Sequence, residues 1–253
     1  MPDATAAGSP QRLVLLPGWA LGPEPLRPLA EAIEQCSDAI SVSCYRYPPL
    51  TSQRLDIWLE ALDEEIEAGC WLGGWSLGGM LATALAEHRG SGARGLVTLA
   101  SNACFVTRAD WSTAMAGDTL SAFGNGLRHR PLDTVRRFAL LCARGGHDTR
   151  RLGQRLLMAL PQLPPEQAAA GLALLRTLDL RRALGRLAVP QLHLFGEQDV
   201  LVPAAARQAI AELLPPTGIT RLIADSGHGF VLEKTEQSAA LIAAFITAGG
   251  RLE

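Results

Sequence analysis

Short apolar runs recur along the chain, and stretches of helical periodicity separate them. The apolar runs have the length of buried strands and cover residues 12–18, 39–47, 70–75, 94–101, 190–196 and 219–225. Between the runs, residues 23–36 and 55–69 place apolar side chains three and four positions apart, as amphipathic helices do. Strands that alternate with helices favour an α/β fold with a mostly parallel sheet flanked by helices.

The alternation stops between the fourth and fifth predicted strands, where the sequence predicts helices only. A third helix of this segment should start after Asp148, a suitable N-cap, and a fourth should have Pro164 or Pro165 in its first turn. The first two helices are predicted from apolar residues at helical spacing, namely Trp111, Met115, Leu120 and Phe123, and then Leu132, Val135, Phe138 and Leu141 after Pro131. We therefore expect a core of residues 1–107 and 187–253 with a helical insertion of residues 108–186.

Composition narrows the class of protein. With 48% hydrophobic residues, the 253-residue chain can bury a large core. No apolar stretch approaches the roughly 20 residues that span a bilayer, and residues 1–12 lack the features of a signal peptide, so we expect a cytoplasmic protein that does not contact membranes. The cysteines are scattered without C-x-x-C spacing, so we expect no disulfide and no metal site, only small reduced core residues at Cys36, Cys44, Cys70, Cys104 and Cys142.

Charge is divided unevenly along the chain. Residues 104–187 hold 13 arginines against six acidic residues, whereas the rest of the chain holds 10 basic and 19 acidic residues. Such a basic segment attracts an acidic partner, although a solvated helical surface is the alternative interpretation. Nucleic acid is a weaker interpretation, because the rest of the chain is net acidic and no binding motif is present.

One serine lies between glycines in the stretch WLGGWSLGGM, residues 71–80. Residues Gly74 to Gly78 fit G-x-S-x-G, the pattern of a nucleophile on a sharp strand-to-helix turn. A predicted strand precedes Ser76, and a stretch rich in alanine and leucine follows it, so Ser76 falls at such a turn. The alternative is a serine that merely caps the helix.

A serine hydroxyl is a weak nucleophile and needs a base together with a group that holds the base. His228 follows the last predicted strand in a glycine-flanked loop, and Asp199 follows the strand at 190–196, so both should lie at the carboxyl edge of the sheet. Glu197 and Asp225 are alternative acids. The order Ser76, Asp199, His228 matches the order in α/β-hydrolases.

The reaction also needs an oxyanion hole, formed by two backbone N–H groups. Leu77, the residue after the nucleophile, supplies one. The loop after the first predicted strand, LLPGWALG, should supply the other from Trp19, whose indole is expected to pack as well.

From residue 13 to residue 232 the chain resembles the α/β-hydrolases, and more narrowly the carboxylesterase family of biotin synthesis that hydrolyses pimeloyl-acyl-carrier-protein methyl ester. The segments that carry the resemblance are LVLLPGWALG, LGGWSLGG, LASNACF, TVRRFALLC, LRTLDLRRAL, FGEQDVLVP and the final histidine loop. The resemblance implies a helical lid, a Ser76–Asp199–His228 triad, an oxyanion hole at Trp19 and Leu77, and no cofactor.

The resemblance also implies a substrate and a partner, and the sequence departs from the family at two points. Acyl-carrier protein would bind the basic segment, for which we single out Arg137, Arg150, Arg151 and Arg155, and we expect a monomer. Where the family commonly reads HGW, this chain has Pro17, so an imidazole contact is lost. The family's first hairpin should be missing or shortened, leaving six or seven strands. The acyl chain would contact Trp19, Phe138, Ala139, Leu140, Leu141 and Cys142.

Other functions would use the same residues. A general carboxylesterase, a thioesterase or a lactonase needs the same triad, and a non-catalytic ligand receptor can be built on a hydrolase scaffold. The acyl length and the alcohol removed do not follow from the sequence.

Overall fold

The computed structural model describes residues 9–252, which form a six-stranded parallel sheet in the order β2-β1-β3-β4-β5-β6. All six predicted strands are confirmed. The prediction that the family's first hairpin is missing or shortened concerns the chain before β1, of which residues 1–8 lie outside the described residues. The strands are β1 (Gln11–Leu16), β2 (Ile40–Cys44), β3 (Trp71–Trp75), β4 (Gly95–Leu99), β5 (Gln191–Gly196) and β6 (Gly218–Ile223).

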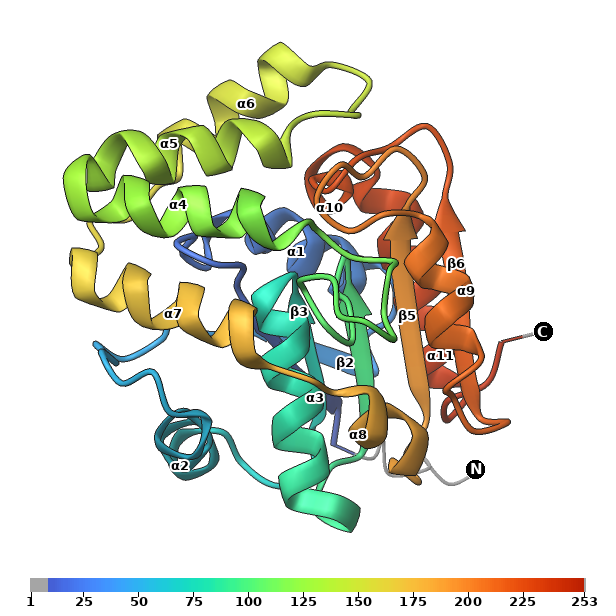
Figure 1. Ribbon diagram of the computed structural model, residues 1–253. Coiled ribbons are helices and arrows are strands. Elements are labelled where there is room, and N and C mark those ends of the chain that lie inside the picture. Colours follow the sequence, from blue (N-terminus) through green and yellow to red (C-terminus); the bar gives the residue numbers. More distant parts are fainter. Residues whose placement is uncertain (1–8, 253) are drawn as a thin grey trace, which may run out of the picture.

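Helices cover both faces of the sheet (Figure 1). The helices α1 and α11 pack against each other behind the sheet, whereas α3 packs against β3 and β4 in front of it. Accordingly β3, β4 and β5 are buried at every residue, and the edge strands β2 and β6 are partly exposed. The core helices are α1 (Arg27–Cys36), α2 (Leu55–Glu65), α3 (Leu77–Arg89), α8 (Arg181–Arg186), α9 (Ala205–Ala211), α10 (Phe230–Glu233) and α11 (Thr235–Thr247), with short 3-10 turns at Glu24–Leu26 and Gly90–Gly92.

Four helices lie between β4 and α8, and Figure 1 shows α4, α5 and α6 stacked at the top of the view. The predicted starts of three of them are confirmed. Asp148 caps α6, since its Oδ1 accepts a hydrogen bond of 2.9 Å from the backbone N–H of Arg151. These helices are α4 (Gly117–His129), α5 (Pro131–Cys142), α6 (Thr149–Met158) and α7 (Pro165–Thr177).

The predicted first helix of this segment is wrong at its start. Trp111 and Met115 lie in a loop ahead of α4, where Met115 forms an isolated bridge with Val106. The indole N–H of Trp111 donates to Asn102 Oδ1 at 3.2 Å. These tertiary contacts override a local helical pattern.

The five cysteines are free thiols in the structure, and contrary to the prediction they are not all core residues. Cys70, Cys104 and Cys142 are buried, Cys44 is partly buried, and Cys36 is exposed. Within residues 9–252 no helix is both long and apolar enough to cross a membrane.

Candidate active site

The order of the strands sets the position of the site. The chain passes from β1 outward to β2 and then returns to form β3 on the other side of β1. In such sheets the loops after the two central strands diverge and leave a crevice at their carboxyl ends. Leu16 at the end of β1 pairs with Gly74 of β3, so the loop after β1 and the turn at Ser76 are neighbours.

Ser76 occupies the turn between β3 and α3 in a strained backbone conformation, with φ 56° and ψ −119°. A non-glycine residue with positive φ is uncommon, and such strain clusters at functional sites. Hydrogen bonds to the end of β4 and the residues after it help to hold the turn: Ser76 N–H donates to the Leu99 carbonyl at 2.8 Å, and the Ser101 hydroxyl donates to the Ser76 carbonyl at 2.9 Å.

The two glycines of the motif are required by close backbone packing. A Cβ at Gly74 would lie 2.3 Å from the Gly78 carbonyl oxygen, and a Cβ at Gly78 would lie 2.1 Å from the Leu16 carbonyl oxygen. Side chains at either position would push α3 away from the sheet. The G-x-S-x-G pattern therefore reflects a steric need of this strand-turn-helix unit.

His228 and Asp199 form the hydrogen-bonded pair that the sequence predicts. His228 Nδ1 lies 2.8 Å from Asp199 Oδ2, and both side chains are buried. The other oxygen, Asp199 Oδ1, accepts bonds from the backbone N–H groups of Leu201 at 2.8 Å and Val202 at 2.9 Å. A carboxylate only accepts, so His228 Nδ1 donates this hydrogen bond, and in the neutral ring Nε2 is left as an acceptor.

The two alternative acids contact each other instead of His228. Glu197 Oε2 accepts from the backbone N–H of Asp225 at 3.0 Å, and both residues are exposed. The structure therefore brings only Asp199 to the histidine.

His228 also lies against the residue before the nucleophile. The indole N–H of Trp75 donates to the His228 carbonyl at 2.9 Å, and the two rings are 5.7 Å apart. Within residues 9–252, Ser76 Oγ and His228 Nε2 are both buried without a hydrogen-bond partner. Buried polar atoms without partners are rare, and each one calls for an explanation such as a catalytic role.

The loop between α5 and α6 packs on the loops that carry the acid and the base. A Cβ at Gly227 would lie 2.1 Å from the Arg144 carbonyl oxygen, and a Cβ at Gly145 would lie 2.1 Å from the Gln198 carbonyl oxygen. Gly145 also has φ +80°, which suits glycine. The helical segment thus touches both loops backbone to backbone.

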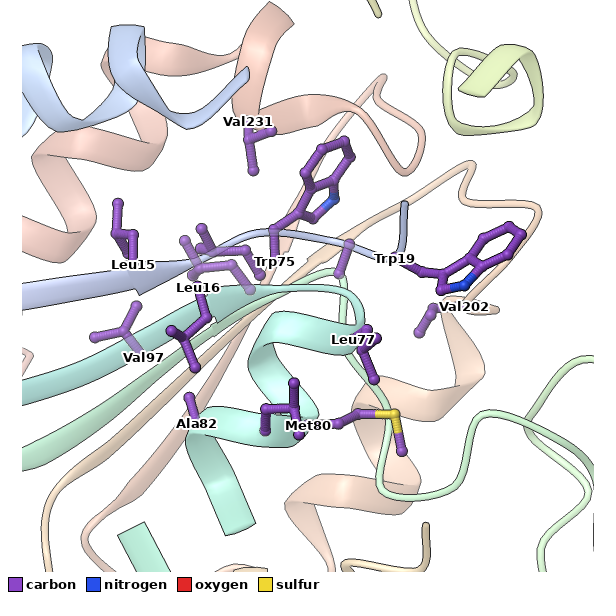
Figure 2. Packing of buried hydrophobic residues seen from close by; sticks show 14 of the residues in the cluster. Leu15, Leu16, Trp19, Trp75, Leu77, Met80, Ala82, Val97, Val202 and Val231 are labelled. Carbon is purple, nitrogen blue, oxygen red and sulfur yellow. The ribbon is translucent and has the colours of Figure 1, made fainter. Parts of the chain in front are cut away.

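The loop after β1, which is expected to complete the oxyanion hole, lies next to Ser76. A Cβ at Gly18 would be 3.6 Å from Ser76 Cβ, so this loop borders the nucleophile. Leu77 is the first residue of α3, and its N–H therefore has no partner inside the helix. Figure 2 shows Trp19 and Leu77 on these two neighbouring segments.

The side chain of Trp19 joins this loop to the helical segment. Its indole N–H donates to the Ala168 carbonyl of α7 at 2.7 Å, and its ring lies edge-on to Phe138, with 4.7 Å between centroids. A Cβ at Gly171 of α7 would lie 2.9 Å from Trp19 Cδ1. The predicted packing of the indole is confirmed, and it closes the site: Ser76 is 1% exposed.

Fewer residues of α5 face inward than the resemblance implies. Phe138, Ala139 and Cys142 are buried, and Leu141 is partly buried. Leu140 is 46% exposed on the opposite face, because five consecutive helical residues span more than one turn. Burial raises the pKa of the Cys142 thiol well above its ordinary value, so this side chain is neutral.

The four arginines singled out from the sequence line two separate grooves. Arg155 faces the core side, where its Nη1 donates to the Leu232 carbonyl at 3.0 Å. A groove of 440 Å³ between α5 and α6 is lined by Arg137, Leu140, Leu141, Arg144, Thr149, Arg150, Gln154 and Leu157. A second groove, of 490 Å³, is lined by His147, Asp148, Arg151, Leu152, Arg155, Leu232, Glu233 and Lys234.

Sequence reasoning missed two polar residues next to the oxyanion loop. The Tyr47 hydroxyl donates to the Pro17 carbonyl at 2.9 Å, and the Gln167 amide donates to the Pro48 carbonyl at 2.9 Å. No local motif marks either residue; the loss of the imidazole contact at Pro17 was the only signal. Residues 9–252 contain no group of three histidine, cysteine or acidic side chains placed to hold a metal ion.

Comparisons with known proteins show the family of the chain. A model of the alpha/beta hydrolase family matches residues 13–244. The chain is 34% identical to a pimeloyl-[acyl-carrier protein] methyl ester esterase of Aromatoleum aromaticum, over 91% of this chain and 96% of that protein. It is 35% identical to a protein of the same name from Xylella fastidiosa, strain M23, over 92% of this chain and 94% of that protein.

Solved structures show the same fold at low identity. An esterase from Exiguobacterium antarcticum has a TM-score of 0.83 and 18% identity, with 95% of this chain and 93% of that chain covered. A bromoperoxidase from Bacillus anthracis has a TM-score of 0.80 and 18% identity, covering 93% and 92%. The family model that matches residues 13–244 shows that the chain belongs to the alpha/beta hydrolase family.

Proposed function

We propose that this protein is a serine carboxylesterase that hydrolyses the methyl ester of pimeloyl-acyl-carrier protein, releasing methanol, in biotin biosynthesis. The buried bond of 2.8 Å between His228 and Asp199, next to a serine on a strained turn, carries the proposal of ester hydrolysis. The names of the relatives that are 34% and 35% identical support this particular ester as the substrate.

The reaction uses groups of this chain at every step. His228 Nε2 takes the proton of Ser76 Oγ as the oxygen attacks the ester carbonyl carbon. The N–H groups of Leu77 and Trp19 stabilise the oxyanion of the tetrahedral intermediate. His228 then gives the proton to the departing methanol. Water repeats the two steps on the acyl-enzyme, and Asp199 stabilises the imidazolium form throughout.

Substrate entry requires the helices over the site to move, and we propose that residues 108–186 act as a lid. Ser76 is 1% exposed and His228 is fully buried, and the indole of Trp19 on the neighbouring loop contacts both α5 and α7. The grooves described on residues 9–252 are lined by residues other than the triad. We place the acyl chain against Trp19 and the inward face of α5, where Phe138, Ala139 and Cys142 lie. The segment 108–186 also contains α8, which packs on α3, so α8 should stay with the core and the part that moves should be α4 to α7.

The groove between α5 and α6 suits an acidic carrier protein. Arg137, Arg144 and Arg150 are exposed around it, and Leu140 and Leu141 supply an apolar floor. Positive charge around such a groove attracts an acidic surface and raises the rate of encounter. We therefore assign carrier binding to the groove between α5 and α6, with Arg137 and Arg150 as its contacts, rather than to the second groove.

The test is incubation with the methyl ester of pimeloyl-carrier protein, with methanol as the readout and Ser76→Ala as the control. Methanol release by the wild type alone supports the proposal. Turnover of p-nitrophenyl acetate without turnover of the carrier ester would instead indicate a general carboxylesterase, a thioesterase or a lactonase. No turnover of either substrate would indicate a ligand receptor.

A further inference from the structure

Three hydrogen bonds form a ring around the loop that follows β1. The Tyr47 hydroxyl donates to the Pro17 carbonyl at 2.9 Å, and the Trp19 indole donates to the Ala168 carbonyl at 2.7 Å. The Gln167 side-chain amide closes the ring by donating to the Pro48 carbonyl at 2.9 Å. The ring joins three segments that are distant in the sequence: the loop after β1, the loop after β2 and the first turn of α7.

The loop after β1 has to be held in place by groups other than the backbone N–H of Trp19. If Trp19 N–H stabilises an oxyanion, it must stay unbonded until the reaction occurs. Pro17 has no N–H, so its carbonyl is its only backbone group that can form a hydrogen bond. Fixing this carbonyl on one side and the Trp19 indole on the other orients the free N–H between them.

The position of Tyr47 follows from the sheet. Tyr45 N–H donates to the Leu15 carbonyl at 2.9 Å, which continues the pairing of β2 with β1 and brings Tyr47, two residues on, to Pro17. The Tyr47 ring packs edge-on against Trp58, with 5.5 Å between centroids. Burial raises the pKa of Tyr47 well above its ordinary value, so the hydroxyl remains a donor.

Gln167 extends the support to the helical segment. Its side chain is buried, at 8% exposure, and it precedes Ala168, the residue that accepts the Trp19 indole bond. A shift of α7 would therefore act on the oxyanion loop twice, through Pro48 and Tyr47 on one side and through Trp19 on the other.

We propose that Tyr47 and Gln167 are positioning residues that orient the backbone N–H of Trp19 for the oxyanion. The inference rests on the proposed ester hydrolysis at Ser76. An oxyanion donor acts in the transition state more than on the bound substrate, so misplacing it lowers kcat and leaves KM nearly unchanged.

The experiment compares Tyr47→Phe and Gln167→Leu with the matched control Tyr45→Phe. The control also removes one tyrosine hydroxyl, but this hydroxyl donates to Glu65 on the exposed surface at 2.7 Å. The assay measures kcat and KM for a p-nitrophenyl ester, and the inhibition constant of a trifluoromethyl ketone, which forms an oxyanion on Ser76.

We expect Tyr47→Phe to lower kcat about 5- to 50-fold, less than the roughly 10²- to 10³-fold cost of removing an oxyanion donor outright. The inhibition constant should rise by a similar factor, while KM stays within about twofold, as transition-state complementarity requires. Gln167→Leu should change the same constants in the same direction, and Tyr45→Phe should resemble the wild type. If Tyr47→Phe matched Tyr45→Phe, or raised KM at constant kcat, the inference would be wrong.

A second measurement does not depend on turnover. Hydrogen exchange of the Trp19 amide should accelerate in Tyr47→Phe and Gln167→Leu, and it should be unchanged in Tyr45→Phe. Unchanged exchange in all three variants would overturn the positioning role. If Ser76→Ala hydrolysed the ester as fast as the wild type, the proposed function would be wrong instead. Failure of the positioning role and failure of the proposed function are therefore distinguishable.

Discussion

Replacing Asp199 by asparagine tests the acid of the triad with a side chain of nearly the same shape. In the native protein Asp199 Oδ1 accepts two backbone N–H groups, from Leu201 and Val202, and Oδ2 accepts His228 Nδ1. Asparagine has one accepting oxygen and one donating NH₂ group. Turning the oxygen toward His228 would leave two buried N–H groups unpaired, at about 1–3 kcal/mol each. The oxygen will therefore stay with the backbone, and the NH₂ group will face the histidine.

This orientation reverses the tautomer of His228. Its Nδ1 must then accept, so the proton moves to Nε2, which can no longer take the proton of Ser76. In a well-studied serine protease the same substitution lowers kcat about 10⁴-fold. We expect Asp199→Asn to lower kcat by about 10³- to 10⁴-fold here, equivalent to about 4–5.5 kcal/mol of transition-state stabilisation. Folding stability should change by less than about 1 kcal/mol, since both backbone hydrogen bonds persist.

The assay is hydrolysis of a p-nitrophenyl ester, alongside urea unfolding as a check of the fold. Asp225→Asn is the matched control, because Asp225 is exposed and its φ of 48° suits asparagine. Activity of Asp199→Asn within about tenfold of the wild type, well short of the effect of a triad substitution, would refute the assignment. A larger loss in Asp225→Asn or Glu197→Gln would identify a different acid.

Three other substitutions test neighbouring parts of the argument. Ser76→Ala should lower esterase activity below about 1% of wild type, since a lost triad member costs several orders of magnitude; an unchanged melting temperature is expected because its hydroxyl has no partner within residues 9–252. Gly78→Ala would bring a Cβ to 2.1 Å from the Leu16 carbonyl oxygen; urea unfolding should show a loss of at least about 1–3 kcal/mol, as for other overpacked sites. Arg137→Ala combined with Arg150→Ala should lower kcat/KM on the carrier ester about 2- to 30-fold, from about 0.2–1 kcal/mol for each exposed pair. The kcat/KM on small esters should not change, and high salt should abolish the difference in kcat/KM between the double variant and the wild type. Equal kcat/KM values on the carrier ester at low salt would show that this groove does not bind the carrier.

The sequence by itself determined the elements whose signals are local. All six strands were predicted from short apolar runs, and the starts of α5, α6 and α7 from Pro131, Asp148 and the prolines before Glu166. The turn at Ser76 was predicted as well, because two glycines at this spacing are a steric requirement of one strand-turn-helix unit. His228 and Asp199 could be singled out because loops after parallel strands meet at one edge of the sheet.

Only the tertiary structure decided which distant groups meet. Asp199, and not Glu197 or Asp225, bonds His228 because of the way two loops pack, and residue spacing does not encode that choice. Packing likewise divided the arginines between two grooves.

The support of the oxyanion loop is the clearest case. Tyr47 and Pro17 are 30 residues apart, and Gln167 and Pro48 are 119 apart. A tyrosine or a glutamine in a loop or helix has many possible partners, and its actual partner depends on how the sheet, the loops and α7 come together. Local patterns identify elements because each element satisfies its own steric and backbone needs, whereas a side-chain bond between elements exists only once the chain has folded.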